Sequence, residues 1–510
     1  MSEKKIQTAL ISVFYKDNLA PIAELLHNQG VTIYSTGGTQ TFLENLGIKP
    51  IPIETVTGYP SIFSGRVKTL HPKVFGGILY RRGEANDVKQ AQEFEIPAID
   101  LVVVDLYPFE ETLGSQGVIQ EEIIEKIDIG GISLIRAAAK NFHDVLVISD
   151  REQYPELLNL LTLKNGFTDL SDRSKFAAQA FATTAHYDTQ IFNFFNHQEA
   201  IHAFRQSIKP ARKLRYGENP HQEGYFYGNL EAMFEQLNGK ELSYNNLVDI
   251  DACIGLIDEF ETGIPAVAII KHTNACGVAT ADTLKNAYLK AFAADTISAF
   301  GGVIVVNQQI DMATAEELNK LFFEVLIAPD YEPEALEMLM SRKNRMLLKR
   351  KPVVLAKKMF KTLLNGVIEQ AKDDHTETTH ELKTVTEKSP SDTEKNALLF
   401  AIKVCKHTKS NTIILAKDGQ LLASGVGQTS RVDALNQAIE KAKHFGFDLK
   451  GAVMASDAFF PFPDCVEIAH QAGISAVVQP GGSIKDQDSI DFCNLNRLSM
   501  VFTGIRHFKH

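Results

Sequence analysis

The chain has 510 residues, of which 44% are hydrophobic and 23% charged, so it has the composition of a globular protein with material for several packed cores. Its formal net charge of -11 argues against a general nucleic-acid-binding protein, because binding a phosphate backbone needs a basic surface. The apolar runs at 99–104 and 264–270 are too short to span a bilayer, so neither nucleic acid nor a membrane is expected as a partner.

The first part of the chain, to about residue 200, alternates strand-like and helix-like segments. Ser171 or Asp172 is the expected N-cap of the last helix of this part. The alternation predicts an α/β domain with a mostly parallel sheet. Strands are expected at 8–13, 31–34, 101–104 and 145–148, and helices at 18–28, 41–46 and 171–195.

The pattern weakens between 197 and 213, where we expect the main domain boundary. A strongly polar insert at 369–395 interrupts the rest of the chain and is interpreted as a surface excursion or linker. The regions on either side of it are similar in size, which suggests a duplicated subdomain. The expected organisation is a first domain at 1–200, a second at 201–510, and subdomains of the second at about 212–368 and 393–510.

The cysteines and the N-terminus favour a cytoplasmic protein. The five cysteines are widely spaced and form no CxxC pair, which is typical of reduced thiols rather than of a disulfide framework or a zinc knuckle. Residues 1–8 are polar and lack the apolar core of a signal sequence.

Residues 35–39, Ser-Thr-Gly-Gly-Thr, lie between a predicted strand and a predicted helix. Glycines let the backbone approach a ligand, and a helix start presents free N–H groups, so this loop suits a phosphate. An ordinary strand-to-helix turn is the commoner interpretation, because the segment matches neither a full P-loop nor a dinucleotide fingerprint.

Two further stretches of the first domain carry charged groups suited to catalysis. Arg66, Lys68 and His71 fall within one short loop, which either holds an anion or is simply solvated. Asp128 and Lys140 lie near the two ends of one predicted helix. An Ala-rich, partly buried setting would shift the pKa of Lys140 and suit it to acid–base work; otherwise it is a surface lysine.

In the second domain, Lys271 and His272 directly follow the apolar run at 267–270. A strand end is a typical place for catalytic groups in parallel α/β folds, although an isolated histidine is more often structural. Residues 456–464 combine aromatic and carboxylate side chains, as a flat heterocycle would need, or form a packed turn. The basic, aromatic C-terminus at 506–510 is either functional or a disordered tail.

Taken together and in order, these segments resemble one known family. They read STGGT, RVKTLHP, LYPF, DIGG followed by RAAAK, LRYGENPHQ, IKHTN, SAFGG, KSN, GQTSR, SDAFFPF and RHFKH. The set covers nearly the whole chain. It resembles the bifunctional purine biosynthesis family, which joins 5-aminoimidazole-4-carboxamide ribonucleotide (AICAR) formyltransferase to inosine monophosphate (IMP) cyclohydrolase.

The resemblance implies an α/β fold with two parts. The N-terminal cyclohydrolase would be a methylglyoxal-synthase-like parallel-sheet domain, and the C-terminal formyltransferase would consist of two cytidine-deaminase-like subdomains. AICAR would take a formyl group from the co-substrate 10-formyltetrahydrofolate, and formyl-AICAR would close to IMP with loss of water. The resemblance also implies a homodimer with the transferase sites at its interface, and no required metal.

The resemblance further implies the residues of both sites. Lys140 matches the proton-transfer lysine of the cyclohydrolase. Lys271 and His272 match the catalytic pair of the transferase, as oxyanion stabiliser and base, and His510 matches a C-terminal active-site histidine. The matching cyclohydrolase positions are Lys16, Thr36, Gly37, Gly38, Thr39, Arg66, Val67, Lys68, Thr69, Asp105, Tyr107, Asp128 and Ile129. The matching transferase positions are Arg215, Tyr216, Gly301, Asn411, Arg431, Phe459, Arg506 and, on the folate side, Asp464.

Two positions depart from the family pattern. Ala275 stands where a proline is usual, and Asp105 stands where an asparagine is usual. A carboxylate facing a phosphorylated substrate would weaken its binding, so Asp105→Asn is expected to improve affinity if the side chain faces the nucleotide. If Asp105 lies in a hydrogen-bonded turn instead, affinity is expected to stay unchanged.

Two other functions fit parts of the pattern. A zinc deaminase would share the implied fold of the second domain, but the sequence has no HxE paired with PCxxC. A non-catalytic nucleotide sensor would keep the phosphate loop and would not need Lys140, Lys271 and His272 together.

Overall fold

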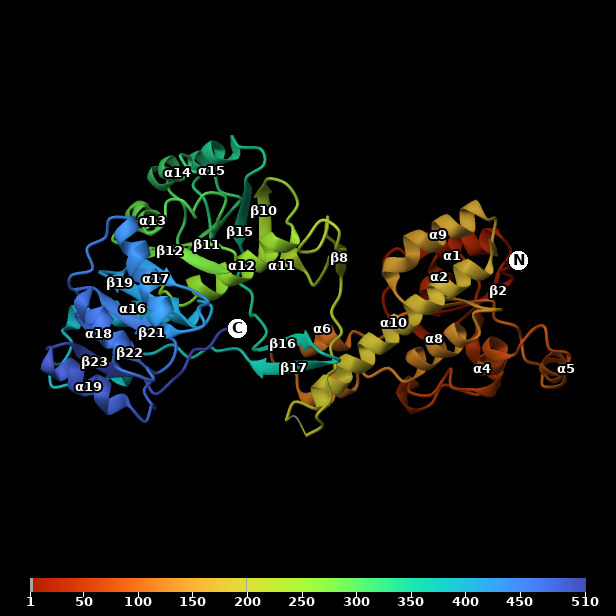
Figure 1. The fold of residues 1–510 in the computed structure, drawn as a ribbon. Coiled ribbons are helices and arrows are strands. Elements are labelled where there is room, and N and C mark those ends of the chain that lie inside the picture. The colour runs from red at the N-terminus through yellow and green to blue at the C-terminus, as the bar shows by residue number, and fades with distance from the viewer. Residues whose placement is uncertain (1–2, 199) are drawn as a thin grey trace. The chain divides into compact units, whose positions relative to one another are not determined.

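The computed structural model describes residues 3–198 and 200–510. The chain divides into two compact units, Met1–Ile208 and Lys209–His510, called unit 1 and unit 2 below (Figure 1). Within the described ranges, no helix is both long enough and apolar enough to cross a membrane.

Unit 1 is built on a five-stranded sheet in which every pair of neighbours is parallel. Its strands are continuous apolar runs because helices cover both faces. The parallel sheet expected from the sequence is therefore present. In spatial order the strands are β4 (Ile51–Pro52), β3 (Thr32–Ser35), β2 (Thr8–Ser12), β5 (Leu101–Val104) and β6 (Leu146–Ile148). A small separate sheet pairs β1 (Lys4–Lys5) with β7 (Phe167–Thr168).

Two clusters of buried apolar side chains hold the helices of unit 1 against the sheet. Leu26 and Leu157, from α1 and α9, pack with Ile11 on one face, whereas Leu134 of α8 packs with Val102 on the other. The helices are α1 (Ala20–Asn28), α2 (Gly37–Asn45), α3 (Ile53–Thr57), α4 (Pro72–Leu79), α5 (Ala85–Glu93), α6 (Phe109–Leu113), α7 (Gln120–Ile124), α8 (Gly130–Lys140), α9 (Tyr154–Leu163) and α10 (Leu170–Phe195).

Helix α10 begins earlier than the sequence pattern indicated. Its N-cap is Asp169, not Ser171 or Asp172, so that expectation is wrong. The Asp169 carboxylate accepts from the N–H of Asp172, and the Asp172 carboxylate accepts from the N–H of Asp169, each at 2.9 Å. This reciprocal pair satisfies two backbone donors, which favours the earlier start.

Unit 2 contains one twelve-stranded sheet made of two halves that repeat the same order of elements. In each half a helix precedes two antiparallel strands, and three helix–strand pairs follow. The halves meet where β12 pairs with β20, with Ala279 opposite Gln420. The topology thus shows the repeat that the sequence suggested.

The strands of this sheet, in spatial order, are β10 (Phe234–Asn238), β15 (Met346–Arg350), β14 (Val325–Ala328), β13 (Val303–Val306), β11 (Ala266–Lys271), β12 (Asn274–Thr280), β20 (Gln420–Gly425), β19 (Ile413–Lys417), β21 (Val453–Ser456), β22 (Ala476–Gln479), β23 (Ser499–Phe502) and β18 (Lys383–Thr384). The helices of the first half are α12 (Tyr244–Ile257), α13 (Leu284–Ala293), α14 (Met312–Leu318) and α15 (Pro333–Met340). Those of the second half are α16 (Asp392–Lys406), α17 (Arg431–His444), α18 (Asp464–Gln471) and α19 (Asp486–Leu495). Near the start of unit 2 lie β8 (Ala211–Lys213), β9 (Tyr225–Tyr227) and α11 (Leu230–Met233).

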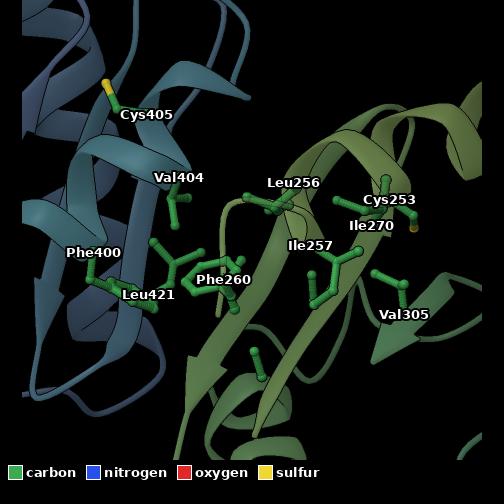
Figure 2. Packing of buried hydrophobic residues seen from close by; sticks show 14 of the residues in the cluster. Cys253, Leu256, Ile257, Phe260, Ile270, Val305, Phe400, Val404, Cys405 and Leu421 are labelled. Atoms are coloured by element: carbon green, nitrogen blue, oxygen red, sulfur yellow. The ribbon is translucent and has the colours of Figure 1, made fainter. Parts of the chain in front are cut away.

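The largest apolar cluster of unit 2 joins its two halves. Leu256 of α12 and Phe260, three residues after that helix ends, lie beside Phe400 and Val404 of α16, as Figure 2 shows. The Phe260 and Phe400 ring centroids are 5.7 Å apart. Because this core draws on both halves, the transferase region implied by the sequence forms one packed body.

The polar insert at 369–395 is more than a surface excursion or linker, so that interpretation is wrong in part. It contains β18, which pairs with β23 at the edge of the large sheet. Glu377 and Thr386 within it are buried. A polar sequence predicts exposure only on average, because a buried carboxylate with partners elsewhere in the fold is stable.

Candidate active sites

Unit 1 contains a cavity of about 600 Å³ at the carboxyl ends of its central strands. Its walls come from the segments that follow β2, β3 and β5 and from the start of α8. In open parallel sheets, the carboxyl ends of the strands are where ligands bind. The lining includes Ser12, Val13, Phe14, Lys16, Thr36, Gly38, Thr39, Arg66, Lys68, Thr69, Asp105, Tyr107, Asp128, Ile129, Gly130 and Gly131.

The N-terminus of α2 forms one end of this cavity. Thr36 is its N-cap and makes no side-chain cap, and the first N–H groups of a helix have no partner within the helix. A Cβ added at Gly37 would lie 3.8 Å from the Lys68 Nζ, so an ammonium group stands next to this helix start. Thr39 fixes the loop, since its hydroxyl donates to the Val13 carbonyl at 2.9 Å. A helix N-terminus beside a lysine suits a phosphate.

Buried acidic and half-buried basic side chains share the cavity. Burial lowers the pKa of Lys16, with Lys68 adding to this and Asp105 opposing it. Burial raises the pKa of Asp128, although the Gly131 N–H donates to its carboxylate at 2.6 Å and Lys68 lies near. A carboxyl whose pKa is raised in this way can give and take a proton closer to neutral pH.

Asp105 lines the cavity, but both of its oxygens are occupied. They accept hydrogen bonds from the backbone N–H groups of Phe14 and, at 2.9 Å, Tyr15. Burial raises the pKa of the Asp105 carboxyl, against the effect of these two bonds and of Lys16. The carboxylate therefore holds the loop that carries Lys16, whose ammonium donates to the Phe14 carbonyl at 2.8 Å.

From this geometry we expect Asp105→Asn to weaken the substrate affinity of the unit 1 site about threefold to tenfold. The amide has one acceptor oxygen for two N–H groups, so one hydrogen bond worth about 1 kcal/mol is lost and the Lys16 loop loosens. The check is the Michaelis constant for the ring closure that the family resemblance implies, measured across a pH range with the exposed Asp17→Asn as control. A lower Michaelis constant in Asp105→Asn would instead support the repulsion considered from sequence.

Most of the implied cyclohydrolase residues meet at this cavity, but three do not line it. Gly37 and Val67 lie next to lining residues, and Val67 pairs with Ile62 in a small bridge. Lys140 is exposed, contrary to the partial burial expected, and lies at the other end of α8 from Gly130. It borders a separate groove of about 650 Å³ lined by Phe75, Leu79, Arg136, Phe142 and Phe181, among others.

In unit 2, the catalytic-pair residues lie at the turn between β11 and β12. Strand β11 is antiparallel to both neighbours, so the expectation of a parallel strand end is wrong here. His272 and Thr273 form the two-residue turn with φ of +50° and +64°. Non-glycine residues rarely adopt this left-handed region, and a β-branched residue such as Thr273 does so at a cost of about 1–3 kcal/mol.

Asp249 of α12 maintains this strained turn. Its Oδ1 accepts from the Thr273 N–H at 2.7 Å, and the Asn274 amide donates to the His272 carbonyl at 2.8 Å. Burial raises the pKa of the Asp249 carboxyl, and the backbone bonds and nearby Lys271 and His272 oppose this. The His272 ring is exposed at the tip of the turn.

Lys271 is held by a neighbouring loop. Its ammonium donates to the carbonyls of Phe300 at 3.1 Å and Gly301 at 3.0 Å. The loop is fixed in turn by Asp295, which accepts from the Ser298 N–H at 2.8 Å and pairs with Lys441 of α17 at 2.7 Å. A lysine has three N–H donors, so one remains for a ligand.

A second group of transferase residues gathers around the C-terminus. The Arg506 guanidinium lies 4.3 Å from the Phe508 ring centroid, and that of Arg431 lies 5.9 Å from the same ring. The Phe508 and His510 rings are 5.4 Å apart. Arg431 also lies 3.9 Å from the buried Asp457 carboxylate, whose pKa is raised by burial.

A hydrogen bond connects the β11–β12 turn with the segment that carries Asn411. The N–H of Lys409, two residues before Asn411, donates to the Asn274 side chain at 3.1 Å. Among the described residues, no hydrogen bond or ion pair joins Arg215 or Tyr216 to Lys271 or His272. Phe459 is 37% exposed in the loop after β21. Asp464 is the first residue of α18 and accepts from the Cys465 N–H at 2.8 Å.

Asp249 is a functional candidate that the sequence pattern does not mark. It falls inside a helix, where nothing identifies it as the partner of a turn 24 residues away. Gly131 belongs to the Asp-Ile-Gly-Gly motif, but only the structure shows that its N–H, in the first turn of α8, donates to Asp128. Within residues 3–198 and 200–510, no group of three or more histidine, cysteine or acidic side chains is arranged to hold a metal ion.

Comparisons with known proteins place the chain among relatives of one kind. The family model described as AICARFT/IMPCHase bienzyme matches residues 138–441, and the MGS-like domain model matches residues 18–133. A protein of Bacteroides thetaiotaomicron called bifunctional purine biosynthesis protein PurH is 58% identical over the full length of both chains. A protein of Aquifex aeolicus with the same name is 47% identical over 98% of this chain and its own full length. A solved structure described as the crystal structure of ForH is 34% identical, covers 37% of this chain and 97% of its own, and has a TM-score of 0.35.

Proposed function

We infer how the two sites work from the premise that this chain belongs to the bifunctional purine biosynthesis family and is an AICAR formyltransferase and IMP cyclohydrolase. It catalyses the final steps of IMP synthesis. The assignment of reactions to units and residues below is our proposal.

Unit 1 is proposed as the cyclohydrolase. The observation that supports this is that one cavity brings together groups suited to the substrate: a helix N-terminus with Lys68 for the phosphate, and the buried Asp128 for proton transfer. The carboxamide nitrogen of formyl-AICAR attacks the formyl carbon and loses one proton. The formamido nitrogen loses a second proton as it forms the C=N bond, and the formyl oxygen leaves as water with these two protons. Both reacting groups belong to one molecule, so holding it in the reactive conformation supplies much of the rate.

Unit 2 is proposed as the formyltransferase, with 10-formyltetrahydrofolate as the formyl donor. The 5-amino group of AICAR is a weak nucleophile, because its lone pair is delocalised toward the carboxamide. His272 takes its proton as it attacks the formyl carbon, and the free N–H of Lys271 donates to the developing oxyanion. The bond between the formyl carbon and N10 of the folate then breaks, and N10 takes the proton from His272 as tetrahydrofolate leaves. Arg215, Arg431 and Arg506 are the proposed partners of the AICAR phosphate and ring substituents, with Tyr216, Gly301, Asn411, Phe459 and His510 as further contacts and Asp464 facing the folate.

The strained turn gives a test of the transferase site. Asp249→Ala is expected to lower formyl transfer about 100-fold, because misplacing a catalytic base by about 1 Å costs that much. Ring closure of supplied formyl-AICAR is expected to stay unchanged. Both steps are measured on the same preparation, with the exposed Asp488→Ala as control. Asp249→Asn keeps an acceptor oxygen for the Thr273 N–H and is expected to recover most of the activity. Equal activity in Asp249→Ala and the wild type would remove Asp249 from the mechanism.

A homodimer is the proposed working form. The hairpin of β16 (Lys358–Leu363) and β17 (Gly366–Ala371) is exposed along its whole length and lies apart from the large sheet (Figure 1). Its apolar side chains include Leu364, which is 98% exposed, and Ile368. An isolated two-stranded hairpin is marginally stable in water, and exposed apolar surface usually contacts a partner. We also propose a cytoplasmic location, because all five cysteines are unpaired and buried.

A further inference from the structure

The polar segment 372–381, called the strap, contacts the C-terminal segment 505–510 through one buried histidine. His507 is 5% exposed. Its Nδ1 lies 2.6 Å from a carboxylate oxygen of Asp373, and its Nε2 lies 2.7 Å from one of Glu377. A ring protonated on both nitrogens can donate to the two carboxyl groups at once. The ring therefore lies between two acidic side chains of the strap, an arrangement that favours the imidazolium form.

The strap is itself anchored to the core of unit 2. The Lys406 ammonium of α16 donates to the His375 carbonyl at 2.8 Å and pairs with Glu259 at 2.7 Å. Thr376 of the strap donates to the same Glu259 carboxylate. Burial alone raises the pKa of Glu259. Hydrogen bonds from His407 and Lys406 outweigh this effect and lower the pKa to about 2, so this carboxylate stays charged. The strap thus has a fixed position from which to hold His507.

Holding His507 determines which way its neighbours point. Side chains of an extended segment alternate between two faces. His507 is buried, whereas Arg506, Phe508 and His510 are exposed. The main chain is held as well: the His507 N–H donates to the Asp457 carbonyl at 3.2 Å, and Ser410 exchanges hydrogen bonds with the Lys509 backbone.

We propose that His507, held between Asp373 and Glu377, is a positioning residue that fixes the C-terminal segment in the register that presents Arg506 and His510 to AICAR. The proposal rests on the proposed function of Arg506 and His510 in the transferase site. It gives the polar insert a role, because the strap carboxylates hold a segment more than a hundred residues away in the chain.

The pH dependence follows from the charges around the ring. Burial alone lowers the pKa of His507, but hydrogen bonds to Asp373 and Glu377 outweigh it and raise the pKa from 6.5 to about 9. Because the folded-state pKa is the higher one, the stabilisation is complete below about pH 6.5 and is lost as the pH rises through about 9. The other titratable groups that the structure describes near the ring and its partners are Lys406 of α16, His407 at the C-cap of α16, Arg431 of α17, Asp457 after β21, and Arg506 and Lys509 of the segment itself.

The test uses the full chain and the AICAR Michaelis constant at pH 6 and pH 8. Glu377→Gln removes one carboxylate, so the ring pKa falls and the ring is neutral at pH 8. We expect the Michaelis constant to rise about tenfold at pH 8, equivalent to about 1.4 kcal/mol, and to return to within about twofold of wild type at pH 6. His507→Asn cannot be protonated and is expected to raise it at both values. The exposed His444→Asn is the control, and ring closure of formyl-AICAR should not change in any variant.

A second measurement does not depend on activity. In ¹⁵N-histidine NMR at pH 7.5, the resonance that disappears in His507→Asn is expected to be that of a doubly protonated ring, and in Glu377→Gln it should be shifted toward the neutral form. A neutral ring in the wild type overturns the proposal. So does a rise in the Michaelis constant of Glu377→Gln that is equal at pH 6 and pH 8, because only a structural role would produce it.

Arg506→Ala separates this proposal from the proposed function. If Arg506→Ala leaves the AICAR Michaelis constant unchanged, the assignment of Arg506 to the transferase site is wrong. If Arg506→Ala raises it while His507→Asn does not, the site assignment stands and the positioning role of His507 is wrong. Thermal unfolding of each variant shows whether the protein is folded before the kinetic constants are compared.

Discussion

His272→Ala is expected to lower formyl transfer by about 100-fold to 10,000-fold, the usual loss when a positioned general base is removed. His272 stands exposed at the tip of the β11–β12 turn, beside a lysine that keeps one N–H free. The loss should appear in the turnover number, because the base acts on the transition state more than on bound substrate. Ring closure of supplied formyl-AICAR should proceed at the wild-type rate, since the described residues that line the unit 1 cavity all belong to unit 1.

The control for this variant is His444→Ala, an exposed histidine on α17 of the same unit. Both variants are assayed for both steps on the same protein. Near-normal formyl transfer in His272→Ala would exclude this residue as the base. Loss of both activities together would point to a folding defect rather than to missing chemistry.

Lys140→Ala is expected to lower ring closure by about 100-fold to 10,000-fold if Lys140 is the proton-transfer lysine. Within one chain Lys140 does not reach the cavity: α8 runs from Gly130, which lines it, to Lys140, and eleven residues of helix span about 15 Å. Its side chain borders the separate groove formed with Phe75 and Phe181. We therefore propose that Lys140, if it acts on the substrate, reaches the cavity of the other subunit in the proposed homodimer.

Mixed dimers test this arrangement. A chain with Lys140→Ala and a chain with Asp128→Asn are co-expressed with different affinity tags, and dimers carrying both tags are purified. If Lys140 acts across the interface, one of the two sites has both groups intact, and about half of the wild-type ring closure is expected. If Lys140 acts within its own chain, both sites are defective and the mixed dimer is as inactive as its parents. The mass in solution, expected at twice 56.5 kDa, confirms that dimers are being measured.

The strands and the clusters of chemical groups could be predicted from the sequence, because both are local. Four apolar residues in a row, Leu101–Val104, predict a strand covered on both faces. The structure contains this strand, and all four residues are buried. The Thr36–Thr39 loop was expected next to a helix start, and it forms one end of the cavity. The cap of α10 was misplaced by a few residues, because Asp169, Ser171 and Asp172 are all good capping residues and only the observed hydrogen bonds distinguish them.

What the sequence determined by itself was the α/β class, the repeat in the second part of the chain, the family and the residue types available for each reaction. Only the tertiary structure decided which of those residues meet. Asp105 accepts hydrogen bonds from backbone N–H groups 90 and 91 residues away, and His507 lies within hydrogen-bond distance of Asp373 across 134 residues. Lys140 lies at the opposite end of α8 from the cavity that the family resemblance implied for it. The physical reason is that periodicity and spacing record interactions within about one helical turn, whereas the partner of a buried charge is set by packing between segments that are distant in the chain.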